Sequence, residues 1–220
     1  IELGIPFSDP IADGPIIQAS YYRALIKGAK VAHVLDMVSE LRKKSEIPIV
    51  SMVSYSTVFK KGYSKFIENS VMSGLDGLTI PDLPVEENQE IFEIARKNDF
   101  KVVCFIAPTT TDQRVSLITQ KAQGFLYYIS VVGITGIRDK LPDDIIQNIN
   151  KLKQMTNIPV AVGFGVSTSE HAKLIGTVAD GVIVGSAIMR EIEKYAKEPS
   201  EELVRGVGEF VGQLISGAKG

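Results

Sequence analysis

Apolar residues follow two spacings along this chain, and the two spacings alternate. Short runs rich in Val and Ile, each bounded by Gly or Pro, are typical of buried strands. Between these runs, apolar residues recur at intervals of three and four, as at Val31, Val34 and Val38, which is typical of helices that pack by one face. The pattern predicts strands near residues 2–5, 48–53, 77–80, 101–106, 125–130, 159–163 and 181–184.

The predicted helices fall between these strands. Spacing indicates helices over 31–41 and 66–71, and the others begin near Val85, Thr111, Asp143, Ser167, Ser186 and Ser200. The segments 111–112 and 167–170 carry the hydroxyl and carboxylate side chains that cap helix N-termini. The last helix, 200–218, has the place of a closing helix.

Strand–helix alternation with buried strands predicts an α/β fold, with a parallel sheet covered by helices. A (β/α)8 TIM barrel needs eight strands, and the chain offers seven strand patterns. Ile1 stands inside a strand pattern and is not an initiator Met. We therefore expect a single barrel domain over residues 1–220, with its first strand and leading helix missing before Ile1. An open doubly wound sheet is the alternative.

Composition limits the classes of function. Of 220 residues, 45% are hydrophobic and 23% charged, with a formal net charge of −2. These values are ordinary for a soluble globular protein, and no broad basic field exists to bind nucleic acid or anionic lipid. The longest apolar runs fall short of the ~20 residues that span a membrane, and no signal-peptide pattern is present. We expect a cytoplasmic protein.

Cysteine and histidine are scarce. Cys104 is the one cysteine and lies in an apolar run, which predicts a buried thiol and excludes an intrachain disulfide. The two histidines, His33 and His171, stand far apart on helical patterns. Without a Cys/His cluster at ligand spacing, we expect no structural metal.

Glu2 is the first candidate for catalysis. In its strand, Ile1, Leu3 and Ile5 share one face, while Glu2 and Gly4 share the other. If the branched face lies under helices, Glu2 points into the barrel, where desolvation raises a carboxyl pKa toward neutrality. The alternatives are an exposed glutamate at the strand end and a buried one paired with Lys or Arg.

Two further carboxylates follow in the loop after this strand. Asp9 lies in Ser-Asp-Pro and Asp13 in Ala-Asp-Gly-Pro. Acids at a strand end and in the next loop are where α/β enzymes place acid–base chemistry. Each sequence is also ordinary turn chemistry, because Asp caps its own backbone.

Glycines mark the ends of three successive strands, in segments 133–136, 163–165 and 185–186. Barrel enzymes bind phosphate after their last strands, at a helix N-terminus that glycine lets the ligand approach. Glycine pairs also occur in plain turns. The chain has no Gly-Lys-Ser/Thr loop, which disfavours nucleotide hydrolysis.

Four apolar side chains near the same rim could form the walls of a site for a flat apolar ligand. Plain core packing is the alternative for each of them. They are Ile17, Tyr127, Phe164 and Ile183.

The segments 2–10 and 12–15 together resemble the signature of the tryptophan synthase alpha subunit family. Four further motifs fall in the family's order and spacing, so that the resemblance runs from end to end. These motifs are at 81–87, 133–136, 163–166 and 185–188.

The resemblance implies a lyase of tryptophan biosynthesis that cleaves indole-3-glycerol phosphate to indole and glyceraldehyde 3-phosphate by retro-aldol chemistry. Glu2 matches the family's acid–base glutamate. Asp13 matches the aspartate that stabilises positive charge at the indole N–H. This chemistry needs no cofactor in this chain. Pyridoxal phosphate is expected only on a partner beta subunit, within an α2β2 tetramer.

The resemblance also assigns the remaining site residues. Thr135 matches a loop threonine that contacts the catalytic aspartate, and 136–140 matches a mobile lid. Asp9 and Asp82 lie on segments that face the beta subunit. Phosphate-binding positions are matched by Gly136, Gly165, Gly185 and Ser186. Indole-pocket walls are matched by Ile17, Tyr127, Phe164 and Ile183.

One departure and several alternatives remain. Where the family commonly has Tyr-Tyr-Asn, this chain has Ser54-Tyr55-Ser56, which affects one pocket wall. A free-standing indole-3-glycerol-phosphate lyase would share the same residues. A non-catalytic regulatory subunit on the same fold would not need both acids. An unrelated phosphate-sugar barrel enzyme would leave the opening motif unexplained.

Overall fold

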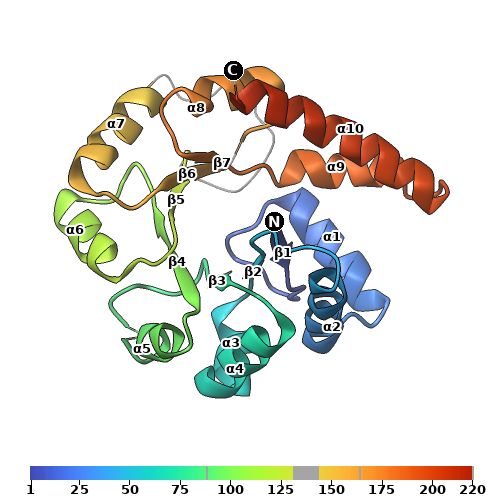
Figure 1. Ribbon diagram of the computed structural model, residues 1–220, viewed down its shortest axis with the longest axis horizontal. Helices are drawn as coiled ribbons and strands as arrows, with labels where there is room; N and C mark the ends of the chain where they lie inside the picture. Colours follow the sequence, from blue (N-terminus) through green and yellow to red (C-terminus); the bar gives the residue numbers. More distant parts are fainter. Residues whose placement is uncertain (88, 131–143, 164, 220) are drawn as a thin grey trace. The chain divides into compact units, whose positions relative to one another are not determined.

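The computed structural model describes residues 1–87, 89–130, 144–163 and 165–219, in which parallel strands and helices alternate (Figure 1). The chain divides into two compact units. The first unit contains Ile1–Ala12, Gln18–Cys104 and Gln120–Gly124. The second contains Asp13–Ile17, Phe105–Thr119 and Phe125–Gly220.

The first unit is built on parallel strands that follow one another in chain order, each paired with the next. They are β1 (Glu2–Gly4), β2 (Val50–Met52), β3 (Gly77–Thr79) and β4 (Lys101–Ile106), which begins in this unit. Residues that pair across neighbouring strands form a row. One row contains Glu2, Val50 and Gly77, and another contains Gly4, Met52 and Thr79.

Helices connect these strands and cover them. They are α1 (Pro15–Ile26), α2 (Val31–Arg42), α3 (Tyr55–Lys61), α4 (Tyr63–Ser73) and α5 (Gln89–Lys97). The apolar face of α4 buries Phe66 and Ile67, while β3 contributes Leu78 and α5 contributes Ile91, all with at most 1% of their surface exposed. This close-packed core holds the strands in place, and the first of them, β1, carries the candidate acid Glu2.

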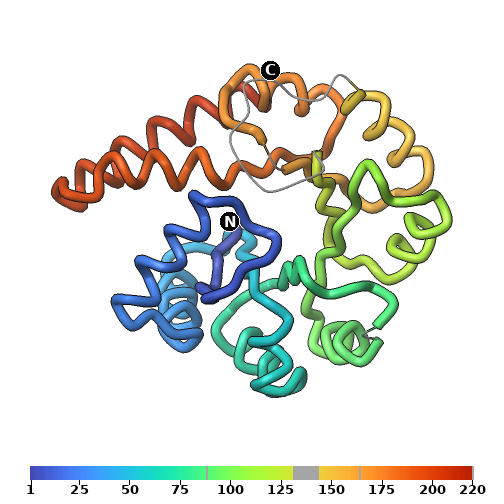
Figure 2. Tube along the Cα trace, turned by 180° about the vertical axis from the view of Figure 1, so that it is seen from behind, coloured from blue at the N-terminus to red at the C-terminus, as the bar shows by residue number. Residues whose placement is uncertain are grey.

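In the second unit, β5 (Leu126–Ile129), β6 (Val160–Gly163) and β7 (Gly181–Val182) pair in parallel. Its helices are α6 (Asp112–Lys121), α7 (Ile145–Met155), α8 (Ser169–Gly176), α9 (Ser186–Lys194) and α10 (Ser200–Lys219). The long α10 runs beside α9 (Figure 2) and packs on α8. Gly217 lets α10 approach α8 closely, because a Cβ there would lie 2.5 Å from the carbonyl oxygen of Ser169.

One hydrogen-bond arrangement fixes the start of a strand in each unit. Asp76 accepts a hydrogen bond from the Ile49 N–H at 2.7 Å, and its own N–H donates to the Ile49 carbonyl at 2.9 Å. Arg42 pairs with the same carboxylate and also donates to the Gly74 carbonyl at 2.6 Å. The end of α2, the turn after α4 and the entry to β3 are thereby joined.

The second unit uses the same arrangement before β7. Asp180 accepts from the Val160 N–H at 2.9 Å and donates its own N–H to the Val160 carbonyl at 2.9 Å. Lys153 of α7 donates to the Asp180 carboxylate at 2.7 Å. The Lys153 hydrogen bond, followed by that of Val160, lowers the pKa of Asp180.

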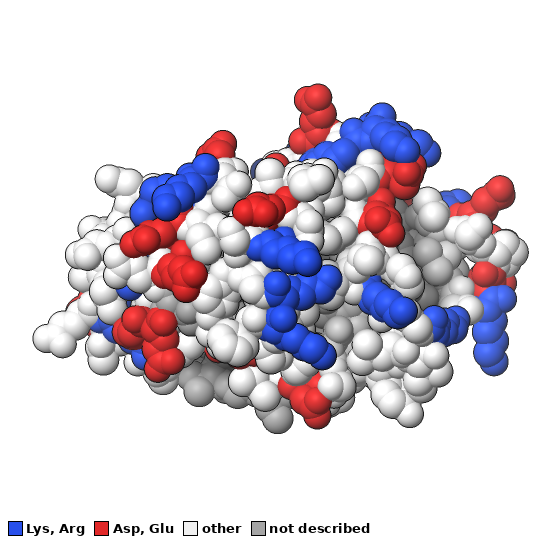
Figure 3. Space-filling view, turned by 90° about the horizontal axis from the view of Figure 1, so that it is seen from below, with Lys and Arg blue, Asp and Glu red and all other residues white. Residues whose placement is uncertain are grey.

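All seven strands predicted from the sequence are confirmed, each one starting or ending within two residues of its predicted bounds. Two helices were not predicted, α1 and α3, and α5 begins at Gln89 rather than near Val85. The predicted cap of α8 is confirmed, since the Thr168 side chain accepts from the His171 N–H at 3.2 Å. On the face that Figure 3 shows, Lys and Arg side chains are interspersed with Asp and Glu.

Candidate active site

Glu2 is the first residue of β1. Its row contains Val50 and Gly77 on the neighbouring strands. Since side chains alternate between the faces of a strand, Glu2 shares a face with Gly4, and Leu3 lies on the other. The Glu2 side chain is half-buried, so its carboxylate is partly withdrawn from water.

A threonine that sequence reasoning missed contacts this carboxylate. The Thr79 hydroxyl donates a hydrogen bond to Oε1 of Glu2 at 2.6 Å. Thr79 ends β3 and is fully buried. The alternation of side chains along a strand could have indicated this residue. Thr79 is two positions after Gly77, which is in the row of Glu2, so Thr79 and Glu2 lie on the same face of the sheet.

Gly4 leaves room for a tyrosine beside the strand. A Cβ added to Gly4 would lie 2.6 Å from the hydroxyl oxygen of Tyr21, which comes from α1 and is buried. Glycine is therefore required at the end of β1 if Tyr21 keeps this position. The Tyr21 side chain thus lies beside β1 at Gly4, two residues after Glu2.

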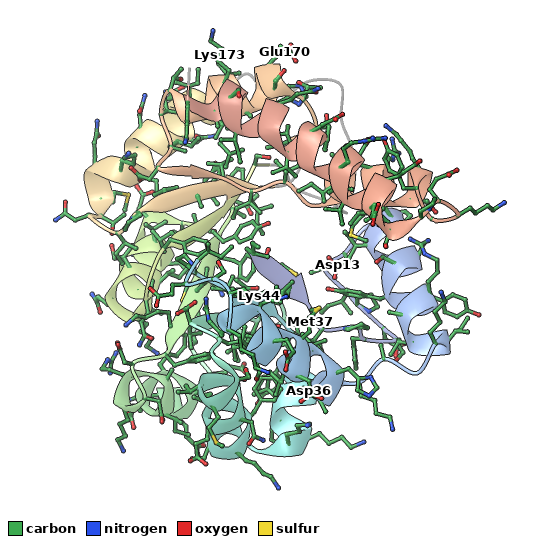
Figure 4. The ribbon with its side chains drawn as sticks, turned by 45° about the vertical axis from the view of Figure 1, so that its right-hand side comes forward. Asp13, Asp36, Met37, Lys44, Glu170 and Lys173 are labelled. Carbon is green, nitrogen blue, oxygen red and sulfur yellow. The ribbon has the colours of Figure 1, made fainter. Side chains whose placement is uncertain are left out.

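Asp13 lies in the irregular segment that leads into α1, where Figure 4 labels it. Pro15 begins that helix, and proline suits the first helical position because its missing N–H has no helical partner there. Burial raises the pKa of Asp13 to about 6. A carboxyl with this pKa changes its charge within the range in which enzymes work. Asp13 belongs to the second unit, whereas Glu2 belongs to the first.

Asp9 and Asp82 differ in their surroundings. Asp9 is exposed and accepts a hydrogen bond from Ser8 at 2.5 Å. Asp82 is half-buried and accepts from the Tyr55 N–H at 2.7 Å and from the Ser54 hydroxyl at 2.8 Å. Asp82 thus holds the first turn of α3, a structural role that the sequence did not indicate. The departure at Ser54-Tyr55-Ser56 falls on this turn.

The start of α9 has the features of an anion site. Ser186 is buried, and its hydroxyl finds no hydrogen-bond partner among the described residues. A Cβ at Gly185 would meet open space, as would one at Gly165, where the backbone has a φ of +92° that favours glycine. An unpartnered hydroxyl beside free helix N–H groups suits a phosphate ligand.

Tyr127 is the most buried of the predicted apolar walls that the structure describes. Its ring is buried, and its centroid lies 4.9 Å from that of Phe105. Gly163 lies against the same ring. Ile183 follows β7, where its N–H donates to the Val162 carbonyl at 2.7 Å. The ring of Tyr127, the second residue of β5, thus reaches Gly163 at the end of the neighbouring β6.

The other predicted positions divide between those described and those not. Ile17 is half-buried in the first turns of α1, and Ile183 is half-buried as well. Thr135, Gly136 and Phe164, together with the predicted lid 136–140, lie outside the described residues.

Cys104 is buried, as the sequence predicts. Burial raises the pKa of its thiol to about 12, so it stays protonated and is a poor nucleophile. Within the described ranges, no group of three or more His, Cys, Asp or Glu side chains has the arrangement of a metal site. Among the helices that the structure describes, none is both long and apolar enough to cross a membrane.

Comparison with known proteins gives one consistent result. The family model described as "Tryptophan synthase alpha chain" matches residues 1–217. A tryptophan synthase alpha chain from a Thermoanaerobacter species is 46% identical over 215 residues, which cover 97% of this chain and 80% of the relative. The alpha chain of Pyrococcus abyssi is 45% identical over 213 residues, covering 96% of this chain and 86% of the relative.

Solved structures agree with the sequence matches. The tryptophan synthase alpha subunit of Legionella pneumophila superposes with a TM-score of 0.89 at 34% identity, covering 99% of this chain and 80% of that one. A chain of the tryptophan synthase α2β2 complex of Pyrococcus furiosus superposes with a TM-score of 0.86 at 42% identity, covering 96% and 86%. These neighbours have the TIM-barrel fold, so the predicted fold class is confirmed.

Proposed function

The chain belongs to the tryptophan synthase alpha chain family, and from this premise we propose that Glu2 and Asp13 are its catalytic acids. The protein is a carbon–carbon lyase of tryptophan biosynthesis that cleaves indole-3-glycerol phosphate to indole and glyceraldehyde 3-phosphate. The observation that carries this function is the family match over residues 1–217.

Glu2 exchanges the two protons that the reaction moves. Its carboxylic acid delivers a proton to the indole ring carbon that bears the glycerol chain. The resulting carboxylate accepts the proton of the side-chain hydroxyl as the carbon–carbon bond breaks. The bonding electrons return to the ring, an aldehyde forms on the departing chain, and Glu2 is again protonated. A half-buried carboxyl near an apolar ring suits both roles.

Asp13 stabilises the intermediate between these steps. Protonation of the ring carbon leaves positive charge on the ring nitrogen, and an ionised Asp13 accepts a hydrogen bond from that N–H. The pKa of about 6 means that Asp13 is ionised at neutral pH, while its partial burial strengthens the attraction. Asp13 and a protonated Glu2 are therefore needed together.

The substrate's phosphate and ring occupy the second unit in this proposal. Gly165, Gly185 and Ser186 bind the phosphate, supported by the unpartnered Ser186 hydroxyl at the start of α9. Gly136 completes that set. By the family resemblance, Tyr127, Ile17, Phe164 and Ile183 are assigned to the walls around the indole, and Thr135 is assigned to the contact with the catalytic aspartate.

The partner of this chain is a tryptophan synthase beta subunit, as in the α2β2 complex of the Pyrococcus furiosus relative. We place Asp9 and Asp82 on the surface that meets it. The acid–base steps above use no cofactor in this chain, and pyridoxal phosphate belongs to the beta subunit. Residues 1–220 form a single barrel domain, and the protein works in the cytoplasm.

Indole release from indole-3-glycerol phosphate tests the function. We expect slow release by the protein alone and a large increase when a beta subunit is added. Fast release that the beta subunit leaves unchanged would indicate a free-standing lyase instead. No release in either condition would contradict the lyase activity.

Glu2→Gln tests the catalytic assignment. The amide keeps the shape of the side chain but exchanges no proton, so turnover should fall at least about 1,000-fold while substrate still binds. Unchanged turnover would show that Glu2 does not transfer the protons.

A further inference from the structure

The hydrogen bond between Thr79 and Glu2 joins two strands that are not neighbours. Glu2 is on β1 and Thr79 on β3, with β2 between them. The hydroxyl donates to Oε1 at 2.6 Å, a short distance for a hydrogen bond to a carboxylate. In parallel barrels, side chains from alternate strands meet in one interior layer, which is the relationship these two residues have.

Glycines stand in the same rows as the two side chains that form this contact. Glu2 is in the row of Gly77, and Thr79 is in the row of Gly4, so each side chain faces a position without one. The Glu2 carboxylate can therefore lean along the strand toward the threonine. A side chain is excluded at both glycines, because a Cβ on Gly4 would meet the Tyr21 ring and one on Gly77 would lie 2.5 Å from the Lys101 carbonyl oxygen.

The surroundings of Thr79 restrict its side chain. It is fully buried at the end of β3, and its β-branched side chain has few allowed rotamers. In the rows that flank the contact, Val50 and Met52 of β2 carry no titratable group. From α1, the buried Tyr21 lies against Gly4 at the end of β1.

A hydroxyl suits a carboxyl that changes its protonation during turnover. It donates to the carboxylate and, after rotation, accepts from the carboxylic acid. An amide N–H or a lysine could only donate and would favour the ionised form throughout. Threonine therefore holds the side chain of Glu2 in both states that the proposed reaction requires.

We propose that Thr79 is a positioning residue for catalysis, which fixes Oε1 of Glu2 so that the carboxyl reaches the indole carbon and the substrate hydroxyl in turn. This inference rests on the proposed role of Glu2. Thr79 acts through Glu2, by its hydrogen bond to Oε1.

Three variants in the full-length protein, assayed with and without the beta subunit, test the proposal. Thr79→Val keeps the shape and removes the hydroxyl, while Thr79→Ser keeps the hydroxyl. Ser51→Ala is the matched control, because the buried Ser51 hydroxyl also bonds to β1, but to the Leu3 carbonyl at 2.9 Å. Circular dichroism confirms that each variant is folded.

Misplacing a catalytic group by a fraction of an ångström costs about tenfold or more in rate, so we expect kcat of Thr79→Val to fall about tenfold with KM within about twofold. Losing a donor to the carboxylate favours the protonated form of Glu2. The basic limb of the kcat/KM profile should therefore move up by roughly half to one pH unit. Thr79→Ser should recover most of kcat, and Ser51→Ala should keep the wild-type profile.

The outcomes distinguish the positioning role of Thr79 from the catalytic role of Glu2, on which it rests. If Glu2→Gln is inactive while Thr79→Val matches the wild type in kcat and pH profile, the positioning role is wrong and the catalytic role of Glu2 stands. A fall in kcat that serine does not recover, with no change in the pH profile, would also overturn it, because that pattern reflects packing. If Glu2→Gln keeps its activity, both assignments fail.

Discussion

The ring of Tyr127 occupies the space that a side chain at Gly163 would need: a Cβ added there would lie 2.6 Å from both Cε1 and the hydroxyl oxygen of the tyrosine. Real Cβ atoms do not approach other atoms this closely. The ring is also buried against Phe105, with 4.9 Å between centroids, so it has little freedom to withdraw. Tyr127 can therefore keep this position only because residue 163, at the end of β6, is glycine.

Gly163→Ala should destabilise the protein and displace Tyr127. Overpacking in a well-packed interior costs about 1–3 kcal/mol of unfolding free energy. Urea denaturation measures that loss, and KM for indole-3-glycerol phosphate should rise because the wall moves. Gly212→Ala on α10 is the control, since its Cβ meets open space and alanine favours a helix by about 1 kcal/mol. Equal stability of Gly163→Ala and the wild type would contradict the packing argument.

Asp13 should make the protein less stable as pH rises toward neutrality. Its pKa in the folded protein is about 6, against an ordinary value of 3.8, so the folded state holds the proton more tightly than the unfolded chain. This contribution to stability is present below about pH 4 and is lost as pH rises through about pH 6. Denaturation across this range should show a falling free energy of unfolding for the wild type, and a flatter curve for Asp13→Asn.

Activity, in contrast to stability, should rise as Asp13 ionises with increasing pH. Because the proposed mechanism needs Asp13 ionised, the acidic limb of kcat/KM should lie near pH 6, where burial places its pKa. Asp13→Asn should lower turnover by about 100-fold or more, since the amide cannot offset the charge on the ring nitrogen. An acidic limb near pH 4 would contradict the raised pKa.

Ser186→Ala should weaken substrate binding without weakening the fold. The buried hydroxyl has no partner among the described residues, so its removal relieves an unsatisfied group and leaves the unfolding free energy equal or higher. A hydrogen bond to a charged phosphate contributes about 1.5–3 kcal/mol, so KM should rise about tenfold or more. Steady-state kinetics and thermal unfolding measure the two effects.

The matched control for this change is Ser70→Ala. Ser70 is also buried, but its hydroxyl donates to the Phe66 carbonyl at 2.8 Å. Its loss should lower stability by about 1 kcal/mol and leave KM unchanged. If Ser186→Ala behaved like Ser70→Ala, the phosphate assignment at the start of α9 would be wrong.

Arg42→Lys should destabilise the first unit. The guanidinium reaches the Asp76 carboxylate and the carbonyls of Gly74 and Ile47, and a lysine ammonium cannot match this fork. We expect a loss of about 1–3 kcal/mol in urea denaturation. Lys43→Ala is the control at the next residue, because its pair with Glu40 is exposed and contributes less than about 0.5 kcal/mol.

A single barrel domain should unfold in one transition. If the two units belong to one domain, as proposed, fluorescence and circular dichroism should report the same midpoint on urea denaturation. Two separate transitions would show that the units unfold independently.

The sequence by itself determined the strands and singled out Glu2 as a candidate acid. Buried parallel strands are short apolar runs between glycines and prolines, so local pattern alone locates them, as for β4 and β6. Thr168 caps α8 through a contact three residues away, and such local contacts are also visible in sequence. Glu2 stood out because a charged residue interrupts an apolar run.

Tertiary structure decided what depends on distant partners. α3 is a helix of only seven residues whose first turn is held by Asp82, 27 residues further along, so no local periodicity could indicate it. α1 did carry a signal, the proline at its first position, but its apolar residues run together, and of them only Tyr21 is buried.

The contact of Thr79 with Glu2 spans 77 residues and depends on the register of three strands. The raised pKa of Asp13 depends on burial, which no sequence spacing contains. Local patterns specify which element forms, because hydrogen bonds within an element act over a few residues. Hydrogen bonding and desolvation at the site depend on what the folded chain brings together from a distance, so only the structure gives them.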